Sequence, residues 1–155
     1  MSLLAGRVKG GAGDASRSLA WAETKIAEAA GFPRVLHGTL NLDLCQVHVF
    51  TPGAMVLPEG PPGTPFLLLE ACRVNRIPGR IVVPTLEPAA PHELHMLEIV
   101  SYRRLRSVLR LRDGDLVEVE TGIDPARWQA IRQRMLSEES PHGKKAAAAA
   151  AAETA

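Results

Sequence analysis

Two neutral oxygen donors, Thr39 and Asn41, stand beside a glycine in the stretch His37-Gly38-Thr39-Leu40-Asn41. Gly38 can adopt backbone conformations that are closed to other residues, so the chain can turn sharply just before a strand begins. Residues two apart in a strand point to the same face, which puts both donors on one side. Hydroxyl and amide oxygens suit a hard cation such as Mg²⁺, whose negative partners come from the phosphates of a nucleotide. The simpler interpretation is a strand start at which the two side chains bind nearby backbone.

A second candidate is the glycine-rich segment that follows a short predicted strand near the N-terminus. Gly10, Gly11 and Gly13 occupy three of four consecutive positions there. Glycines let backbone N–H groups converge on an anion where side chains would block its approach. Asp14 is unusual for a phosphate site unless it faces a base, a sugar or the following helix. An ordinary surface loop would have the same composition.

Other charged residues gather in the second half of the chain. Glu98 lies inside the apolar stretch Met96–Val100, and an unpaired buried carboxylate is costly, whereas an alternating surface strand would expose it harmlessly. Arginines at 103, 104, 106, 110 and 112 form either a solvated helix face or a local anion-binding patch. His92 and His95 have no third ligand at a plausible spacing, so we expect surface positions rather than a metal site.

Chain length, net charge and cysteine content limit the class of protein. A chain of 155 residues favours one domain. A net charge of +1 gives no general attraction to nucleic acid or to anionic membranes. Residues 1–11 lack an apolar run of signal-peptide length, and no window has the roughly 20 apolar residues of a membrane span, so we expect a cytoplasmic protein, with a monomer favoured. Cys45 and Cys72 match no zinc or redox spacing and are expected to be buried free thiols.

These candidate residues need elements to position them, and the first half of the chain offers a helix and a long strand. Apolar residues at helical spacing predict a helix over Ser18–Ala30, ended by Gly31. The strand that begins at Leu40 is expected to change face after Leu44, because apolar alternation moves from even to odd positions there. Thr51–Pro65 is rich in Pro and Gly and predicts a surface excursion with little strand content.

The second half predicts further strands and two helices. Phe66–Val74 and Arg80–Val83 form a hairpin whose turn is Ile77-Pro78-Gly79. Later elements are expected at Met96–Val100 (strand), 102–109 (short helix), Leu116–Glu120 (strand, with Val117 and Val119 facing in and Glu118 and Glu120 facing out), and from Asp124-Pro125 to about Ser137 (helix). Residues 1–138 then form one domain, and 139–155 an alanine-rich tail without fixed structure. Short strands without α/β alternation indicate a mainly β protein built as a small barrel.

With the elements placed, the chain resembles the CTP-dependent riboflavin kinases of archaea, which are small six-stranded cradle-loop (RIFT-type) β-barrels. The resemblance rests on the order and spacing of several pieces between about Val8 and Glu120. They are Gly11-Ala12-Gly13-Asp14-Ala15, Gly31-Phe32-Pro33, Gly38-Thr39-Leu40-Asn41, Arg80-Ile81-Val82-Val83-Pro84, Leu97-Glu98-Ile99-Val100 and Leu111-Arg112-Asp113-Gly114-Asp115-Leu116-Val117.

The resemblance implies transfer of the γ-phosphoryl group of CTP to the 5′-hydroxyl of riboflavin, which gives FMN and CDP. Thr39 and Asn41 match the family's Mg²⁺ ligands, and Glu98 matches a carboxylate on the flavin side that can orient the substrate hydroxyl or take its proton. Ala90 aligns with a second flavin-side position. The nucleotide-binding segments correspond to Ala12, Gly13, Asp14, Ala15, Ser16 and Arg17, and to Arg103, Arg104, Leu105 and Arg106.

Departures from the family pattern leave a second interpretation open. Ala15 stands where the family has a third glycine, Ala90 stands where it has a threonine, and Ser101-Tyr102 replaces Ala-Pro. Thr85 takes the place of that threonine only if the proline-rich loop shifts register. Because most of these changes lie on the flavin side, the alternative is a diverged barrel that binds a nucleotide or a flavin without catalysis. Nucleic acid binding through residues 103–112 is disfavoured by the near-zero net charge.

Overall fold

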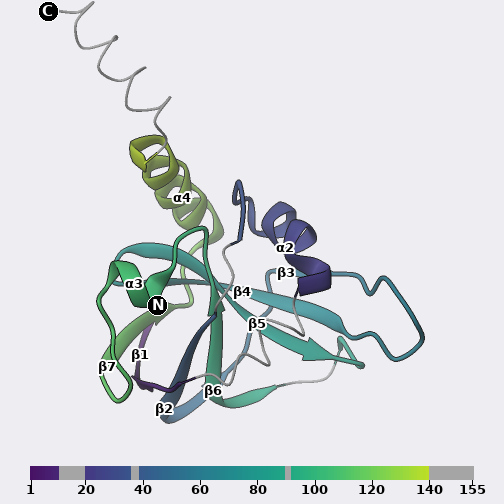
Figure 1. Ribbon diagram of the computed structural model, residues 1–155, viewed down its shortest axis with the longest axis horizontal. Helices are drawn as coiled ribbons and strands as arrows, with labels where there is room; N and C mark the ends of the chain where they lie inside the picture. Colours follow the sequence, from purple (N-terminus) through teal and green to yellow (C-terminus); the bar gives the residue numbers. More distant parts are fainter. Residues whose placement is uncertain (11–19, 36–38, 90–91, 140–155) are drawn as a thin grey trace, which may run out of the picture.

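A computed structural model describes residues 1–10, 20–35, 39–89 and 92–139, which form a β-barrel with helices at one end (Figure 1). The strands are β1 (Ser2–Val8), β2 (Leu40–Val49), β3 (Ala54–Val56), β4 (Phe66–Val74), β5 (Ile77–Thr85), β6 (Glu93–Val100) and β7 (Leu116–Thr121). The helices are the 3₁₀ turn η1 (Ala20–Ala22), α2 (Glu23–Ala30), α3 (Leu105–Val108) and α4 (Pro125–Glu139).

Six antiparallel strands close into a ring in the order β4-β5-β6-β2-β1-β7. The ring is completed where β7 returns to β4, with Arg73 opposite Glu120 and Val74 opposite Val119. The short strand β3 pairs with the other half of β4, outside this ring. Closure removes the unpaired edges that an open sheet of this size would expose. The predicted small six-stranded barrel is therefore confirmed.

Strand alternation separates an apolar interior from the outer face that carries the candidate site. Leu40 and Leu42 of β2 and Leu97 and Ile99 of β6 are each at most 2% exposed and belong to the main core cluster. The residues between them point to the opposite face because successive strand residues alternate. A second apolar cluster forms where α2 packs over β3, β4 and β5, with Ile26 fully buried.

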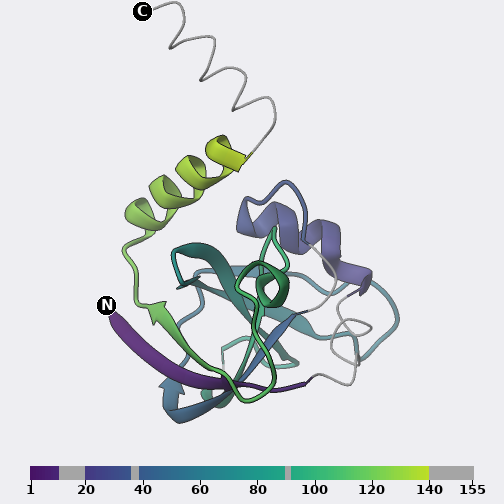
Figure 2. The same ribbon diagram turned by 60° about the vertical axis from the view of Figure 1, so that its left-hand side comes forward.

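The helices lie where the sequence predicted them. Helix α2 ends at Gly31, whose φ of 74° lies in the left-handed region that favours glycine. Helix α4 begins after Asp124, whose carboxylate accepts a hydrogen bond from the Arg127 backbone N–H at 3.1 Å. Both views place α2 and α4 at the same end of the barrel, and α4 extends away from it (Figure 1, Figure 2).

The hairpin between β4 and β5 turns earlier than predicted. Its turn residues are Asn75 and Arg76, with φ of 45° and 74°, and the strand register runs unbroken from Val74↔Ile77. Left-handed conformations at both positions match the strand twist of a two-residue hairpin. The expected turn at Ile77-Pro78-Gly79 is wrong, because these residues already belong to β5. A Cβ on Gly79 would lie 3.0 Å from Ile99 Cγ2, so a close approach rather than a turn explains this glycine.

The predicted change of face on β2 is also wrong, although the register between β2 and β6 does shift between Asp43 and His48. On β2 the buried residues stay at even positions, Leu40, Leu42 and His48, while Val47 and Val49 are 45% and 64% exposed. Gln46, in the irregular stretch, is exposed as well. The change falls on β6, where Leu94 packs against the core and the next inward residue is Leu97. The irregular pairing between β2 and β6 thus changes which residues of β6, rather than of β2, face the core.

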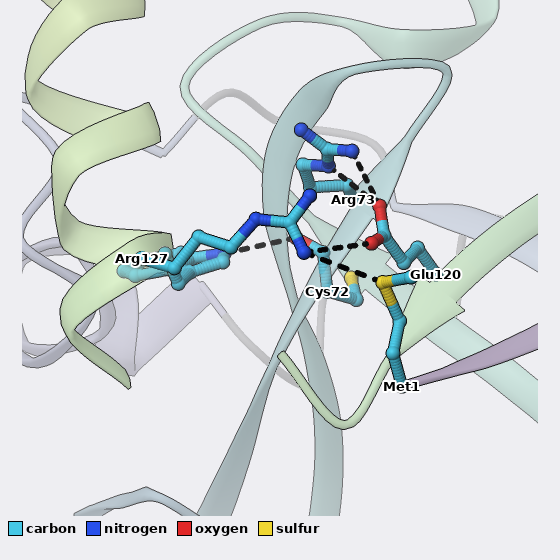
Figure 3. A network of polar contacts seen from close by, with 6 residues as sticks. Met1, Cys72, Arg73, Glu120 and Arg127 are labelled. Carbon is cyan, nitrogen blue, oxygen red and sulfur yellow. Dashed lines mark hydrogen bonds and ion pairs between the residues drawn. The ribbon is translucent and has the colours of Figure 1, made fainter. Parts of the chain in front are cut away.

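Two further expectations fail at single residues. Cys72 is buried as predicted, but Cys45 is exposed. Glu118 faces solvent as predicted, but Glu120 is only 8% exposed. By alternation with Val119 this carboxylate is on the outer face, and Figure 3 shows what covers it: Arg73 of β4 reaches it with N–O distances of 2.7 and 2.6 Å, and Arg127 of α4 lies 3.8 Å away. Buried charges persist when they are paired in this way.

Trp128 joins α4 to the barrel. Its side chain is 1% exposed, and its indole N–H donates a hydrogen bond of 3.0 Å to the carbonyl oxygen of Cys72. Within the described residues, no helix combines the length and apolar character that crossing a membrane requires. The tail was predicted to begin at residue 139. Glu139 is instead the last residue of α4, and residues 140–155 lie outside the described residues.

Candidate functional site

Thr39, Asn41 and Glu98 come together on the outer face of neighbouring strands. Asn41 on β2 stands directly opposite Glu98 on β6 in the antiparallel register. Thr39, two residues before Asn41, hydrogen-bonds to the Glu98 side chain. Thr39, Asn41 and Glu98 are partly buried. A hydroxyl, a carboxamide and a carboxylate thus share one small area, although Thr39 and Glu98 are 59 positions apart in the sequence.

Glu98 occupies an unusual environment for a carboxylate. Its Oε1 atom is buried and has no hydrogen-bond partner within the part of the chain that the structure describes. Desolvation raises the pKa of Glu98, and the hydrogen bond from Thr39 opposes that rise without cancelling it. A carboxylate with a raised pKa and a vacant acceptor oxygen is suited to receive a proton or a hydrogen bond from a ligand. The sequence left open whether this residue was exposed, and the structure shows that it is largely withdrawn from water.

Strand β1 brings a cation to the other side of Asn41. The backbone N–H of Lys9 donates to the Asn41 carbonyl at 2.9 Å, one step beyond the Val8↔Leu42 pair. Since Val8 and Leu42 face the core, alternation places Lys9 and Asn41 on the same outer face. Lys9, Asn41 and Glu98 therefore form a row across three adjacent strands. Sequence reasoning missed Lys9, because only the order β1-β2-β6 in the sheet makes it a neighbour of Asn41.

The start of the glycine-rich segment is held close to the arginine segment. A Cβ on Gly10 would lie 2.9 Å from Oδ2 of Asp113, and Asp113 Oδ1 is 2.8 Å from the Arg106 guanidinium. The Gly114 N–H also donates to the Val8 carbonyl at 2.7 Å. These contacts bring the C-terminal end of β1 beside the loop that follows α3, so two segments about 100 residues apart in the numbering meet at one edge of the site.

The predicted segment 103–106 contains residues with different surroundings. Arg104 is exposed at the N-terminus of α3, Arg103 and Arg106 are partly buried, and Leu105 is 4% exposed. The Leu105 side chain therefore packs in the core and leaves only its backbone for a ligand. Tyr102 immediately precedes this segment. Its ring packs against the ring of Phe32, which follows the C-terminus of α2, and the two ring centroids are 5.3 Å apart.

Ser101 anchors the same segment on its other side. Its hydroxyl donates a hydrogen bond of 2.8 Å to the Pro78 carbonyl, and the side chain is buried. The departure Ser101-Tyr102 from the family pattern thus has a structural role in this chain, since both residues fix the approach to α3. The remaining predicted positions, Ala12 to Arg17 and Ala90, lie outside the described residues.

The donor set at Thr39 and Asn41 is compatible with Mg²⁺. A hydroxyl and an amide carbonyl are hard oxygen donors of the kind that this ion prefers, and few protein ligands are needed when phosphates and water complete the shell. No group of three or more His, Cys, Asp and Glu suited to a metal occurs within the described residues. An ion at this place would therefore depend on phosphates as much as on the protein.

The second half of the barrel matches a known family. Residues 65–121 match the family model of CTP-dependent riboflavin kinases, whose description is Domain of unknown function DUF120. A riboflavin kinase of Archaeoglobus fulgidus is 49% identical over 51 residues, which cover 32% of this chain and 20% of the relative's own length. The family match contains Glu98 and the segment 103–106, whereas Thr39 and Asn41 lie before it. On these matches, residues 65–121 of the chain are similar to the CTP-dependent riboflavin kinases.

Proposed function

We propose that this protein is a riboflavin kinase that transfers the γ-phosphoryl group of CTP to the 5′-hydroxyl of riboflavin, giving FMN and CDP. The similarity of residues 65–121 to riboflavin kinases supports the reaction class. The observation that carries the proposal is the cluster of Thr39, Asn41 and Glu98 beside Lys9 on one face, where the buried Oε1 of Glu98 has no hydrogen-bond partner among the described residues. Phosphoryl transfer requires alignment and charge neutralisation more than covalent chemistry by the protein, and this cluster offers both.

Each residue has a separate role in the proposed reaction. Glu98 accepts the proton of the riboflavin hydroxyl as its oxygen forms a bond to the γ-phosphorus, while the bond from that phosphorus to the bridging oxygen breaks and CDP leaves. Thr39 and Asn41 would hold Mg²⁺, which when bound neutralises charge on the phosphates. Lys9 adds a positive charge on the same face, and Arg103, Arg104 and Arg106 lie where the family places its second nucleotide-binding segment.

The raised pKa of Glu98 suits a general base that works near neutral pH. Burial favours the protonated form, so the carboxylate gains more by taking a proton than an exposed glutamate would. A base of this kind transfers its proton most efficiently when its pKa approaches the working pH. We therefore expect activity to rise with pH as Glu98 loses its proton.

The proposed function is tested by incubating the full chain with riboflavin, Mg²⁺ and one nucleoside triphosphate at a time, and by measuring FMN by chromatography. We expect FMN with CTP and less with ATP. Asn41→Ala should remove turnover while leaving the melting temperature close to that of the parent protein, because the Asn41 side chain lies outside the core. Asp43→Ala, an exposed change two residues further along the same face of β2, is the matched control and should retain activity.

The second candidate, a barrel that binds without catalysis, gives a different result. The substitutions Ala15 and Ala90 at nucleotide-side and flavin-side positions favour it. Under this alternative, CTP or riboflavin would raise the melting temperature, because a ligand that binds only the folded state stabilises it, yet no FMN would form. Absence of both turnover and thermal shift with every nucleotide and flavin would refute both functions.

A further inference from the structure

A pocket lies between the barrel and α4, and it shares no residue with the candidate site. Its volume is about 550 Å³. Arg80 of β5, Glu70 of β4 and Asp124 before α4 contribute charged groups, while Trp128 of α4 contributes an aromatic ring. The rest of the wall is mainly small or apolar, and includes Pro52, Ala71, Ile123 and Pro125. The part of the wall that α4 and the residues before it supply follows residue 121, so it lies outside the segment that matches the family, whereas Glu70, Ala71 and Arg80 lie inside that segment.

Among the described residues, no acidic side chain forms an ion pair with the buried cation of Arg80. The residue is 6% exposed, and its Nε atom is buried with no hydrogen-bond partner among the described residues. The guanidinium carbon lies 4.1 Å from the centre of the Trp128 ring, so the ring holds one face of the group. Desolvation lowers the pKa of Arg80. A buried guanidinium normally has a carboxylate or phosphate beside it, because an unpaired buried charge is costly.

Glu70 does not act as the missing partner, although it lines the same pocket. Its Oε1 lies 2.5 Å from Nε2 of His48, and its Oε2 accepts the backbone N–H of Thr51 at 3.2 Å. No ion pair joins Glu70 to Arg80 within the described part of the chain. Both oxygens of this carboxylate are therefore occupied, while the Arg80 donors remain available to a ligand.

We propose that this pocket binds a small organic monocarboxylate whose carboxylate meets Arg80 and whose apolar body lies against Ile123, Pro125 and Trp128. A guanidinium presents its N–H groups in a planar fork that matches a carboxylate. The volume greatly exceeds that of a simple inorganic anion, and the apolar wall would leave such an ion poorly surrounded. Because Glu70 adds a negative charge to the same wall, a dianion such as a phosphate ester meets more repulsion than a monoanion.

The test uses NMR of the ¹⁵N-labelled full chain, which has two tryptophans. Trp21→Phe leaves the Trp128 indole N–H as the single indole signal. Benzoate, phenylacetate and indole-3-acetate are titrated, with benzamide and phenyl phosphate as matched neutral and dianionic compounds. We expect saturable shifts of the Trp128 signal with at least one carboxylate, in the millimolar range or tighter, and weaker binding of the amide and the phosphate.

Two variants locate the binding. Arg80→Gln should weaken the carboxylate at least about tenfold, because it removes a desolvated charged donor. Gln129→Phe places a larger side chain at the exposed wall of the pocket and should weaken binding while leaving Arg80 unchanged. This variant provides the test if Arg80→Gln fails to fold. Arg134→Gln removes an equal charge from an exposed part of α4 and should change affinity by less than about twofold.

Three results would overturn the proposal. They are no saturable Trp128 shift with any carboxylate, equal binding of benzoate and benzamide, and equal or tighter binding of phenyl phosphate. Full affinity in both Arg80→Gln and Gln129→Phe would also refute it. Riboflavin kinase activity is measured separately, and because none of the pocket residues belongs to the candidate site, loss of that function would leave this result unaffected.

Discussion

Replacing Glu98 with glutamine should make the protein more stable near neutral pH and inactive at the same time. The buried Oε1 has no partner within the described residues, and an unpartnered charged group costs more to bury than an unpartnered neutral one. A neutral amide of the same shape removes the charge and keeps an acceptor toward Thr39, although it leaves a polar group unpartnered at the same place. We expect a gain of about 1 kcal/mol, which corresponds to a rise in melting temperature of about 2–4 °C for a chain of this length.

The pH dependence of the free energy of unfolding provides a second test of this prediction. The pKa of Glu98 in the folded protein is raised above its ordinary value, chiefly by desolvation. Between these two values the folded state binds more protons than the unfolded state, so the free energy of unfolding falls as pH rises. The slope from this one group cannot exceed about 1.4 kcal/mol per pH unit. In Glu98→Gln this contribution disappears, and the two proteins should therefore diverge as pH rises through that window.

The assay is urea unfolding followed by circular dichroism from about pH 4 to about pH 8. Glu118→Gln is the matched control, because Glu118 is exposed on β7. This control should follow the parent protein at every pH and retain turnover. Loss of a general base should lower turnover of Glu98→Gln by about 10²–10⁴-fold. If Glu98→Gln is less stable than the parent protein at neutral pH, or has the same pH slope, the argument from burial is refuted.

Three other changes probe separate parts of the fold and site. Glu120→Ala should lower the free energy of unfolding by about 3 kcal/mol in urea unfolding, because it leaves the partly buried Arg73 without its partner, and an unchanged midpoint would contradict the pairing. Gly79→Ala should cost about 1–3 kcal/mol in the same measurement, since its Cβ would lie 3.0 Å from Ile99 Cγ2, and a neutral effect would show that β6 yields easily. Lys9→Met should raise KM for CTP by about tenfold in steady-state kinetics, and an unchanged KM would remove Lys9 from the nucleotide site.

The sequence predicted that Thr39 and Asn41 share one face because strand alternation is a local property. Once Leu40 and Leu42 are assigned to the core, Thr39 and Asn41 must point to the other face, and the same reasoning applies to Glu98 between Leu97 and Ile99. What the sequence could not supply is the pairing of β2 with β6, which sets Asn41 opposite Glu98. That pairing depends on the order of strands around the closed barrel, which no single segment encodes.

The errors have physical causes of two kinds. The hairpin turn was misplaced because Asn75-Arg76 lacks the glycine that usually marks left-handed turn residues, while Pro78-Gly79 carries a turn signal inside a strand. Glu120 was expected to be exposed because alternation gives only the face of the strand, and here Arg73 from another strand covers the carboxylate on that face. The first error is therefore one of local turn chemistry, and the second comes from packing between distant segments.

The position of β2 between β1 and β6 explains why the site depends on the whole barrel. Lys9, Asn41 and Glu98 share a face only while β2 keeps its register with both neighbours, and a slip of one residue would turn Asn41 into the core. The irregular pairing after Asp43 affects only the part of β6 that precedes Met96. Leu94 can therefore face the core while Glu98 stays on the outer face. The barrel thus tolerates one register shift because that shift lies beyond the residues that form the site.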